Sequence, residues 1–171
     1  MAQQRTYIAP EEWNDRVFRR IGSEWMLLSA ARRDGSMNGM TASWGGFGVL
    51  WGVPVCFGFI RPQRYTFALA EEAEHLSFCF FSEEYRDALR YYGSHSGRLE
   101  DKAAACGLHA AIDAEGYPDY EEASVIVRAD KYYADFLHRE CFVTEEPLGN
   151  YRQNDFHKMY ICRIRDIGVR S

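Results

Sequence analysis

The sequence predicts an α+β protein, mainly β, in which a mostly antiparallel barrel carries peripheral helices. Strand-like runs follow one another along the chain with short helices between and outside them, whereas a doubly wound fold requires strict alternation of strand and helix. Of the 171 residues, 47% are hydrophobic and 26% charged, as in a globular protein with a sizeable core. There is no internal repeat or low-complexity linker, so residues 1–171 are expected to form a single domain.

The first third of the chain predicts one helix and three strands. Pro10 and the two glutamates after it suit the first turn of a helix over residues 10–20, because proline needs no N–H partner there and acids favour the positive helix end. Gly45, Gly46 and Gly48 predict a loop after the second strand. The three predicted strands span residues 25–31, 40–45 and 54–60.

The third of these strands is a continuously apolar run, which is typical of a strand buried on both faces. Gly58 within it indicates that another group approaches the backbone closely. A loop over residues 61–64 then leads into a helix predicted over residues 65–73. Residues 76–81 predict a strand, because their large apolar side chains alternate and would share one face.

The second half of the chain predicts two more helices and two long strands. Ser82 offers a capping hydroxyl, and the acids after it suit the first turn of a helix that ends near Gly93. A shorter helix ends at Gly107, since glycine readily adopts the conformation that closes a helix. A loop is predicted around residues 116–118. The two long strands span residues 123–136 and 156–169.

Composition argues against several classes of protein. The chain has no run of 18 apolar residues and no apolar signal-peptide segment, so neither a membrane span nor secretion is predicted. A formal charge of −5 without a basic block argues against nucleic acid as a partner. Five well-separated cysteines and scattered histidines argue against a disulfide framework and a metal site. We therefore expect a cytoplasmic protein with reduced thiols and no bound metal.

Three polar clusters suit an anionic ligand. Thr41 and Ser43 are two residues apart, which would place both hydroxyls on one face of a strand. Arg61, Arg64 and Thr66 stand where a strand ends and a helix begins, and arginines and free N–H groups at such a place suit a phosphate. The third cluster contains Ser94, His95, Ser96 and Arg98. Nearby aromatic residues would let the three clusters hold a phosphorylated aromatic ligand.

Each cluster taken alone has a simpler structural interpretation. A Thr-x-Ser pair on a strand is more often sheet surface than a functional site, an Arg-Pro-x-Arg segment is usually a solvated turn, and a Ser-His-Ser-Gly segment is usually a capping loop. The sequence also lacks the standard signatures of a serine hydrolase, a zinc protease and a phosphate-binding P-loop. Residue chemistry alone therefore leaves the choice of ligand open.

Four blocks in order resemble the flavin reductase-like, FMN-binding split-barrel family, which includes flavoredoxin. The first is the run Asn-Gly-Met-Thr-Ala-Ser-Trp at 38–44, and the second is the strand that closes with Arg-Pro-Gln-Arg-Tyr-Thr at 61–66. The third is Phe-Phe at 80–81 followed by His-Ser-Gly-Arg at 95–98 and Asp-Lys at 101–102, and the fourth is the strand that begins at His157. The resemblance covers about residues 20–165 and leaves residues 108–120 and 137–155 unmatched.

The resemblance implies a split β-barrel that forms a homodimer and holds FMN near the dimer interface. Thr41, Ala42 and Ser43 would line the flavin and its phosphate, while Gly58 would leave room for the ring. His157 would be the catalytic residue near the hydride donor. The cofactor-binding residues that the resemblance implies are Met40, Thr41, Ala42, Ser43, Trp44, Phe59, Arg61, Arg64, Tyr65, Thr66, His95, Ser96 and Arg98, of which His95 and Ser96 would reach the cofactor from the same or the partner subunit.

The favoured function is that of an FMN-binding oxidoreductase, an NAD(P)H-dependent flavin reductase that passes electrons through bound FMN to a small-molecule or protein redox partner. The alternative is a flavoredoxin-like electron carrier, which would exchange electrons with a protein partner and turn over no small molecule itself. A third hypothesis is a binding protein that keeps the barrel but uses another ligand or none. No motif in the sequence identifies the electron donor or the final acceptor.

Overall fold

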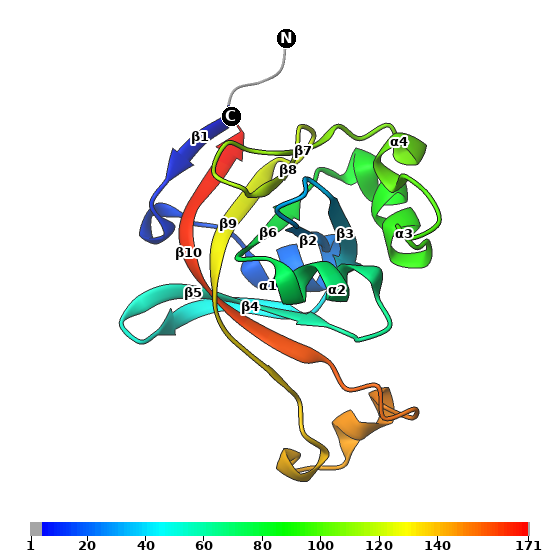
Figure 1. Ribbon diagram of the computed structural model, residues 1–171. Helices are drawn as coiled ribbons and strands as arrows, with labels where there is room; N and C mark the ends of the chain where they lie inside the picture. Colours follow the sequence, from blue (N-terminus) through cyan, green and yellow to red (C-terminus); the bar gives the residue numbers. More distant parts are fainter. Residues whose placement is uncertain (1–4, 171) are drawn as a thin grey trace.

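The computed structural model describes residues 5–170 and confirms the predicted α+β class (Figure 1). Eight antiparallel strands form one curved sheet in the order β3-β2-β6-β9-β10-β5-β4, and β1 pairs with the far end of β10. A separate hairpin consists of β7 and β8. The strands of the large sheet are β1 (Arg5–Ile8), β2 (Met26–Ala31), β3 (Met37–Ala42), β4 (Gly45–Leu50), β5 (Val53–Ile60), β6 (His75–Phe80), β9 (Val125–Phe136) and β10 (Lys158–Arg170).

The two edges of this sheet are joined by only two residues. β3 ends at Ala42 and β4 begins at Gly45, yet these strands lie at opposite ends of the sheet order. Because Ser43 and Trp44 cannot span a long distance, the edges must lie close together, and the sheet therefore curls into a barrel. No ladder closes it between β3 and β4 among the described residues, so the barrel is split there.

The predicted loop at Gly45, Gly46 and Gly48 is wrong, because these residues form the edge strand β4. Gly45 takes a φ of +152°, and a Cβ there would come 2.6 Å from the Phe57 carbonyl oxygen, so only glycine fits this corner. β4 and β5 are joined by Trp51 and Gly52, whose positive φ values of 54° and 72° suit a two-residue hairpin turn.

The helix predicted over residues 10–20 is also wrong as one element. A 3-10 turn covers Pro10–Glu12, the short helix α1 covers Val17–Arg19, and a π-helical turn covers Arg20–Glu24. Ser82 does not cap the helix that follows it, because its hydroxyl donates to the Glu84 side chain at 2.7 Å. The other helices follow the predictions: α2 (Tyr65–Glu72), α3 (Arg86–Ser94) and α4 (Lys102–Cys106).

Two apolar clusters lie on opposite faces of β6. Leu76, Phe78 and Phe80 belong to the larger cluster inside the barrel, as their predicted alternation requires, whereas Cys79 belongs to a second cluster with residues of α3. Gly58 of β5 also faces the interior, where a Cβ would come 2.9 Å from Leu28 and 3.2 Å from Phe78. The close approach predicted at Gly58 is therefore that of core side chains, not of a ligand ring.

β9 and β10 extend beyond the barrel as a long ribbon, and residues 137–157 form an arm at its end (Figure 1). The arm holds two 3-10 turns, Arg139–Cys141 and Glu146–Asn150. Phe142, Tyr151 and Phe156 pack together in it, with ring centroids 4.7–6.0 Å apart.

Residues 108–120, which the family resemblance leaves unmatched, contain the hairpin of β7 (Ala110–Ile112) and β8 (Pro118–Tyr120). The loop predicted at residues 116–118 forms the turn of this hairpin together with the start of β8. All five cysteines are free. None of the helices in the described part of the chain has the length and apolarity needed to cross a membrane.

Candidate functional site

A cavity of about 180 Å³ opens at the split of the barrel, where the end of β3, the end of β5 and the start of β10 meet. We call it the His157 cavity. All of its lining residues belong to the predicted site: Met40, Thr41, Ala42, Ser43, Trp44, Phe59, Arg61, Arg64 and His157. Ser43 lies just beyond β3, so the strand face that it was predicted to share with Thr41 does not exist, but both residues line the same cavity.

His157 is the buried polar group of this cavity, with 8% of its surface exposed. Its ring packs against Trp44 with centroids 4.8 Å apart and meets Phe59 edge-on at 6.4 Å. Its Nδ1 atom lies 2.9 Å from the Tyr151 hydroxyl. Burial and, less strongly, the positive charge of Arg61 lower the pKa of His157 to about 4, so the imidazole is neutral near pH 7.

Arg61 lines the His157 cavity, but its guanidinium holds the arm. It pairs with the carboxylate of Asp155, donates to the Asn150 carbonyl at 2.9 Å and lies 5.4 Å from the Tyr151 ring centroid. Gln63 donates to the same Asp155 oxygen at 2.9 Å. These contacts fix the segment that carries Tyr151 against the end of β5.

A second cavity of about 200 Å³ adjoins the first through Arg64, which lines both. We call it the Arg64 cavity. It is enclosed by the start of α2, the end of α3 and the loop after α3. Its lining residues are Asn38, Gln63, Arg64, Tyr65, Thr66, Gly93, Ser94, His95, Ser96, Gly97 and Lys102.

Two cations converge on the wall of the Arg64 cavity. Arg64 donates to the carbonyls of Tyr92 at 3.1 Å and Gly93 at 3.2 Å, and Lys102 donates to those of Gly39 at 2.8 Å and Tyr92 at 3.5 Å. Within residues 5–170, neither cation forms an ion pair with an Asp or Glu side chain. The end of α3 supplies about half a negative charge, which does not neutralise two cations.

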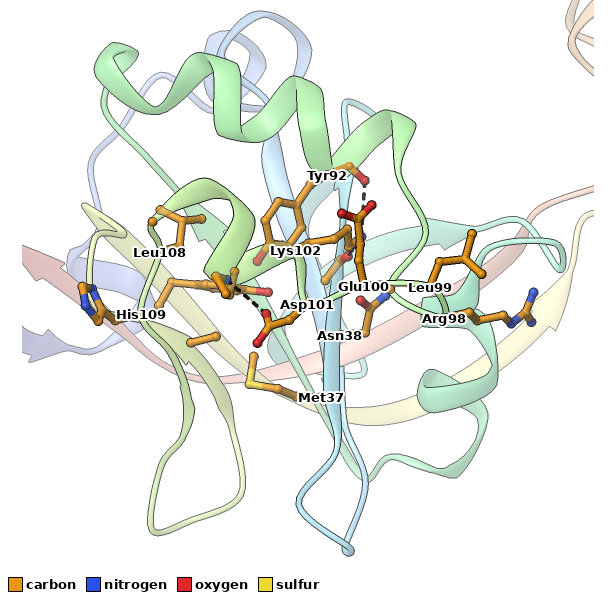
Figure 2. Close-up of a pocket in the computed structure, with 17 residues that line it drawn as sticks. Met37, Asn38, Tyr92, Arg98, Leu99, Glu100, Asp101, Lys102, Leu108 and His109 are labelled. Carbon is orange, nitrogen blue, oxygen red and sulfur yellow. Dashed lines mark hydrogen bonds between the residues drawn. The ribbon is translucent and has the colours of Figure 1, made fainter.

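Lys102 is 4% exposed, an unusual position for an ammonium group without a carboxylate. Burial and, less strongly, the charge of Arg64 lower its pKa to about 8. Figure 2 shows its side chain beside the ring of Tyr92, whose centroid lies 4.6 Å from Nζ. Lys102 also lines a larger cavity, about 950 Å³ in volume, whose lining residues include Arg98 (Figure 2).

Neutral polar side chains complete the Arg64 cavity. Asn38 is buried and donates to the Thr66 hydroxyl at 2.7 Å, which fixes two groups between β3 and α2. The His95 ring stacks on Tyr91 with centroids 3.7 Å apart, which places it at the rim. Gly97 leaves space for Asn38, because a Cβ at Gly97 would overlap that side chain. Thr41 lines the His157 cavity instead, and its hydroxyl donates its hydrogen bond to the Leu89 carbonyl.

The structure thus brings the predicted site residues into two adjoining cavities of one chain, with Arg98 alone lining the larger cavity beside them. His95 and Ser96 line the Arg64 cavity of their own chain. Sequence reasoning missed Lys102 and Asn38, although both stand inside blocks that carried the resemblance. It also missed Tyr151 and Asp155, because their segment matched no motif.

No protein-family model and no curated protein matches the sequence. Solved structures match its fold. An FMN-binding protein from Thermus thermophilus, with bound 1-cyclohex-2-enone, is 21% identical over 95% of this chain and 79% of its own, with a TM-score of 0.65. Flavoredoxin of Desulfovibrio vulgaris is 19% identical over 95% and 76%, with a TM-score of 0.67. Nitrilotriacetate monooxygenase component B from Bacillus cereus is 16% identical over 96% and 81%, with a TM-score of 0.67.

These likenesses define the class of fold. The chain has the barrel fold of the FMN-binding, flavin reductase-like proteins, as its four sequence blocks predict. The two cavities, by their residues, form a site with a cationic end and an aromatic end.

Proposed function

We propose that this chain is an FMN-binding oxidoreductase, with the flavin phosphate in the Arg64 cavity and the flavin ring in the His157 cavity. The observation that carries the proposal is the pair Arg64 and Lys102, two cations that share one carbonyl oxygen and have no carboxylate partner. A phosphate carries nearly two negative charges near pH 7 and would compensate both. Asn38 and Thr66 complete the polar wall.

The sizes and linings of the two cavities fit the two ends of FMN. Each is smaller than the roughly 300 Å³ at the lower end for small-molecule sites, whereas the two together reach it. Trp44, Phe59 and His157 give the second cavity the aromatic walls that a flat ring requires. The fold likeness to FMN-binding proteins supports the same assignment.

When bound, FMN supplies the hydride and electron transfer, and the protein supplies binding, orientation and electrostatics. Arg64 and Lys102 hold the anionic end. Trp44 covers one side of the His157 cavity and is 42% exposed, which leaves access for a second molecule. His157 offers a neutral imidazole at the aromatic end.

We assign NAD(P)H as the electron donor in the favoured form of the proposal, a flavin reductase. The second candidate is an electron carrier like flavoredoxin, and the fold likeness to that protein favours it. Stopped-flow reduction of the FMN-loaded protein by NADH, NADPH and a reduced ferredoxin separates the two. Rapid reduction by either nicotinamide supports the reductase, and reduction by ferredoxin alone supports the carrier.

We also propose a homodimer. The β4–β5 hairpin exposes Val49 at 75% and Trp51 at 58%, and the projecting arm exposes Val143 at 98%. Apolar side chains on projecting elements suit burial against a second copy. Light scattering after size exclusion tests this: twice the mass of 19.8 kDa is expected, and a monomer contradicts it.

The first test of FMN binding is the visible spectrum of the protein after it is mixed with FMN and freed of excess. A flavin double band that stays with the protein is expected. The double substitution Arg64→Met, Lys102→Met should abolish retention, whereas Arg90→Met on the exposed face of α3 should retain it. A wild-type protein that retains no FMN overturns the proposal of a held cofactor.

A further inference from the structure

Tyr151 and His157 form a buried polar pair inside an aromatic cluster. Tyr151 is 5% exposed and His157 8%, and the Tyr151 hydroxyl lies 2.9 Å from Nδ1 of His157. The rings of Phe142 and Phe156 pack on Tyr151 from the arm, and Trp44 packs on His157 from the barrel. The pair therefore connects the arm, which no sequence motif explained, to the lining of the His157 cavity.

The direction of the hydrogen bond between the Tyr151 hydroxyl and Nδ1 of His157 follows from which of the two groups has another acceptor for its proton. Among residues 5–170 the Tyr151 hydroxyl has no other hydrogen-bond partner. If Nδ1 of His157 donated to it, the hydroxyl proton would be buried without an acceptor, which is costly. The hydroxyl therefore donates to Nδ1, and the proton of the neutral imidazole resides on Nε2.

The groups that face His157 keep the ring neutral. Arg61 lies on one side and disfavours a second proton, while Asp155 favours one but is already paired with Arg61. Tyr151 contributes a hydroxyl whose own pKa is raised by burial, so it stays protonated. Trp44 and Phe59 add no charge. With burial as the largest effect, the pKa of His157 falls to about 4.

We propose that Tyr151 is a positioning residue, which holds His157 in the Nε2–H tautomer so that this N–H donates a hydrogen bond to the ligand in the His157 cavity. Nε2 makes no hydrogen bond to another of the described residues, and the ring lines the cavity. The acceptor is a carbonyl oxygen or an unprotonated ring nitrogen of the ligand. The Nε2–H tautomer of His157 is inferred from the geometry alone, whereas the identity of the ligand rests on the proposed function.

A fixed neutral donor acts differently from a proton donor. It transfers no proton, because its charge is unchanged before and after the reaction, and it stabilises an acceptor atom that gains negative charge. Its effect should not depend on pH between about 5 and 8, since the imidazole does not titrate there. A histidine that supplied a proton would instead show such a dependence.

The test is the imidazole ¹⁵N spectrum of the ligand-free protein, with His157 assigned by comparison with His157→Gln. For the wild type we expect the Nε2–H tautomer and no titration of His157 between pH 5 and 8. In Tyr151→Phe we expect a mixture of tautomers and an upward shift of the titration midpoint by roughly one pH unit, since one hydrogen bond to the neutral form is lost. Tyr133→Phe is the matched control, because its hydroxyl donates to Asp135 at 3.1 Å.

An Nδ1–H tautomer in the wild type, or an unchanged spectrum in Tyr151→Phe, overturns the proposal. A second readout follows FMN: the absorbance maximum of bound FMN should shift with pH between 5 and 8 in Tyr151→Phe and stay constant in the wild type and in Tyr133→Phe. A constant maximum in all three contradicts the contact with the flavin. If the wild type binds no FMN, the proposed function fails, while the ¹⁵N result still decides the role of Tyr151.

Discussion

Arg64 and Lys102 donate to the same oxygen, the carbonyl of Tyr92, at 3.1 Å and 3.5 Å. Two like charges held this close repel each other, and burial lowers the pKa of both groups. A folded chain tolerates such a pair when an anion neutralises it for part of its working cycle. In the proposed function, the arrangement links a cost in the unliganded protein to a gain on binding phosphate.

Lys102→Met tests this link through opposite effects on affinity and stability. The substitution removes a charged hydrogen bond to the phosphate, so the Kd for FMN should rise roughly 10- to 100-fold. The melting temperature should stay the same or rise, because an uncompensated buried charge is replaced by an apolar chain of similar length. Fluorescence titration with FMN and thermal denaturation measure the two effects. A fall in stability with unchanged affinity would make Lys102 a structural residue.

FMN affinity should depend on the protonation of Lys102. Its pKa is about 8 in the folded chain, and the phosphate binds the charged form. Affinity should therefore be nearly constant between about pH 7 and pH 8 and fall above pH 8, by up to tenfold per pH unit as one proton is lost. The free energy of unfolding of the FMN-free protein should rise between pH 8 and 10.5. In this range the unfolded chain, with an ordinary lysine pKa of 10.5, binds more protons than the folded chain.

Lys102→Met supplies the control for this pH profile, since FMN binding by the variant should lose the step near pH 8. Titrations at pH 7, 8 and 9 in one buffer system are sufficient. A step of equal size in the variant would assign the titration to another group.

The sequence predicted the barrel, and most of the candidate residues that it offered line the two cavities, for reasons that the structure makes plain. Apolar runs and turn signals are local, so they identified β5, β6 and α2 almost to the residue. Thr41, Arg64 and Thr66 were found because each stands within a short motif of neighbouring residues. Lys102 was not assigned a role, because its lack of a carboxylate partner becomes visible only when β3, α2 and α3 are assembled.

The failures share a physical cause as well. Glycines as dense as Gly45, Gly46 and Gly48 usually indicate a loop, but here pairing with β5 and the corner at Gly45 outweigh their low strand propensity. The arm has no periodic pattern, since aromatic packing within it and the pairing of Arg61 with Asp155 shape it, and that ion pair joins residues 94 positions apart. No local pattern predicts contacts of that kind.

Gly58→Ala distinguishes a core glycine from one that contacts a ligand. A Cβ would approach Leu28 and Phe78 more closely than packed atoms allow, so stability should fall by about 1–3 kcal/mol. FMN affinity of the folded protein should not change. Gly46→Ala in the adjacent strand is the control, because a Cβ there would lie at an ordinary 3.5 Å from Phe57. Urea denaturation measures the stability of both variants, and titration with FMN measures their affinity. A loss of FMN affinity in Gly58→Ala would show that this glycine contacts the ligand.

Arg61→Met decides between two roles for an arginine that the sequence assigned to the phosphate. In the structure its guanidinium pairs with Asp155 and donates to the Asn150 carbonyl, so its loss should free the arm. Limited proteolysis should then cut residues 137–157 several-fold faster, and Asp155→Asn should produce the same change with an intact Arg61. The double substitution Arg61→Met, Asp155→Asn should cut little faster than either single variant, because both substitutions break the same ion pair between Arg61 and Asp155. If Arg61 instead binds phosphate, Arg61→Met will weaken FMN binding as much as Lys102→Met and leave the cleavage rate unchanged, while Asp155→Asn will leave the affinity intact.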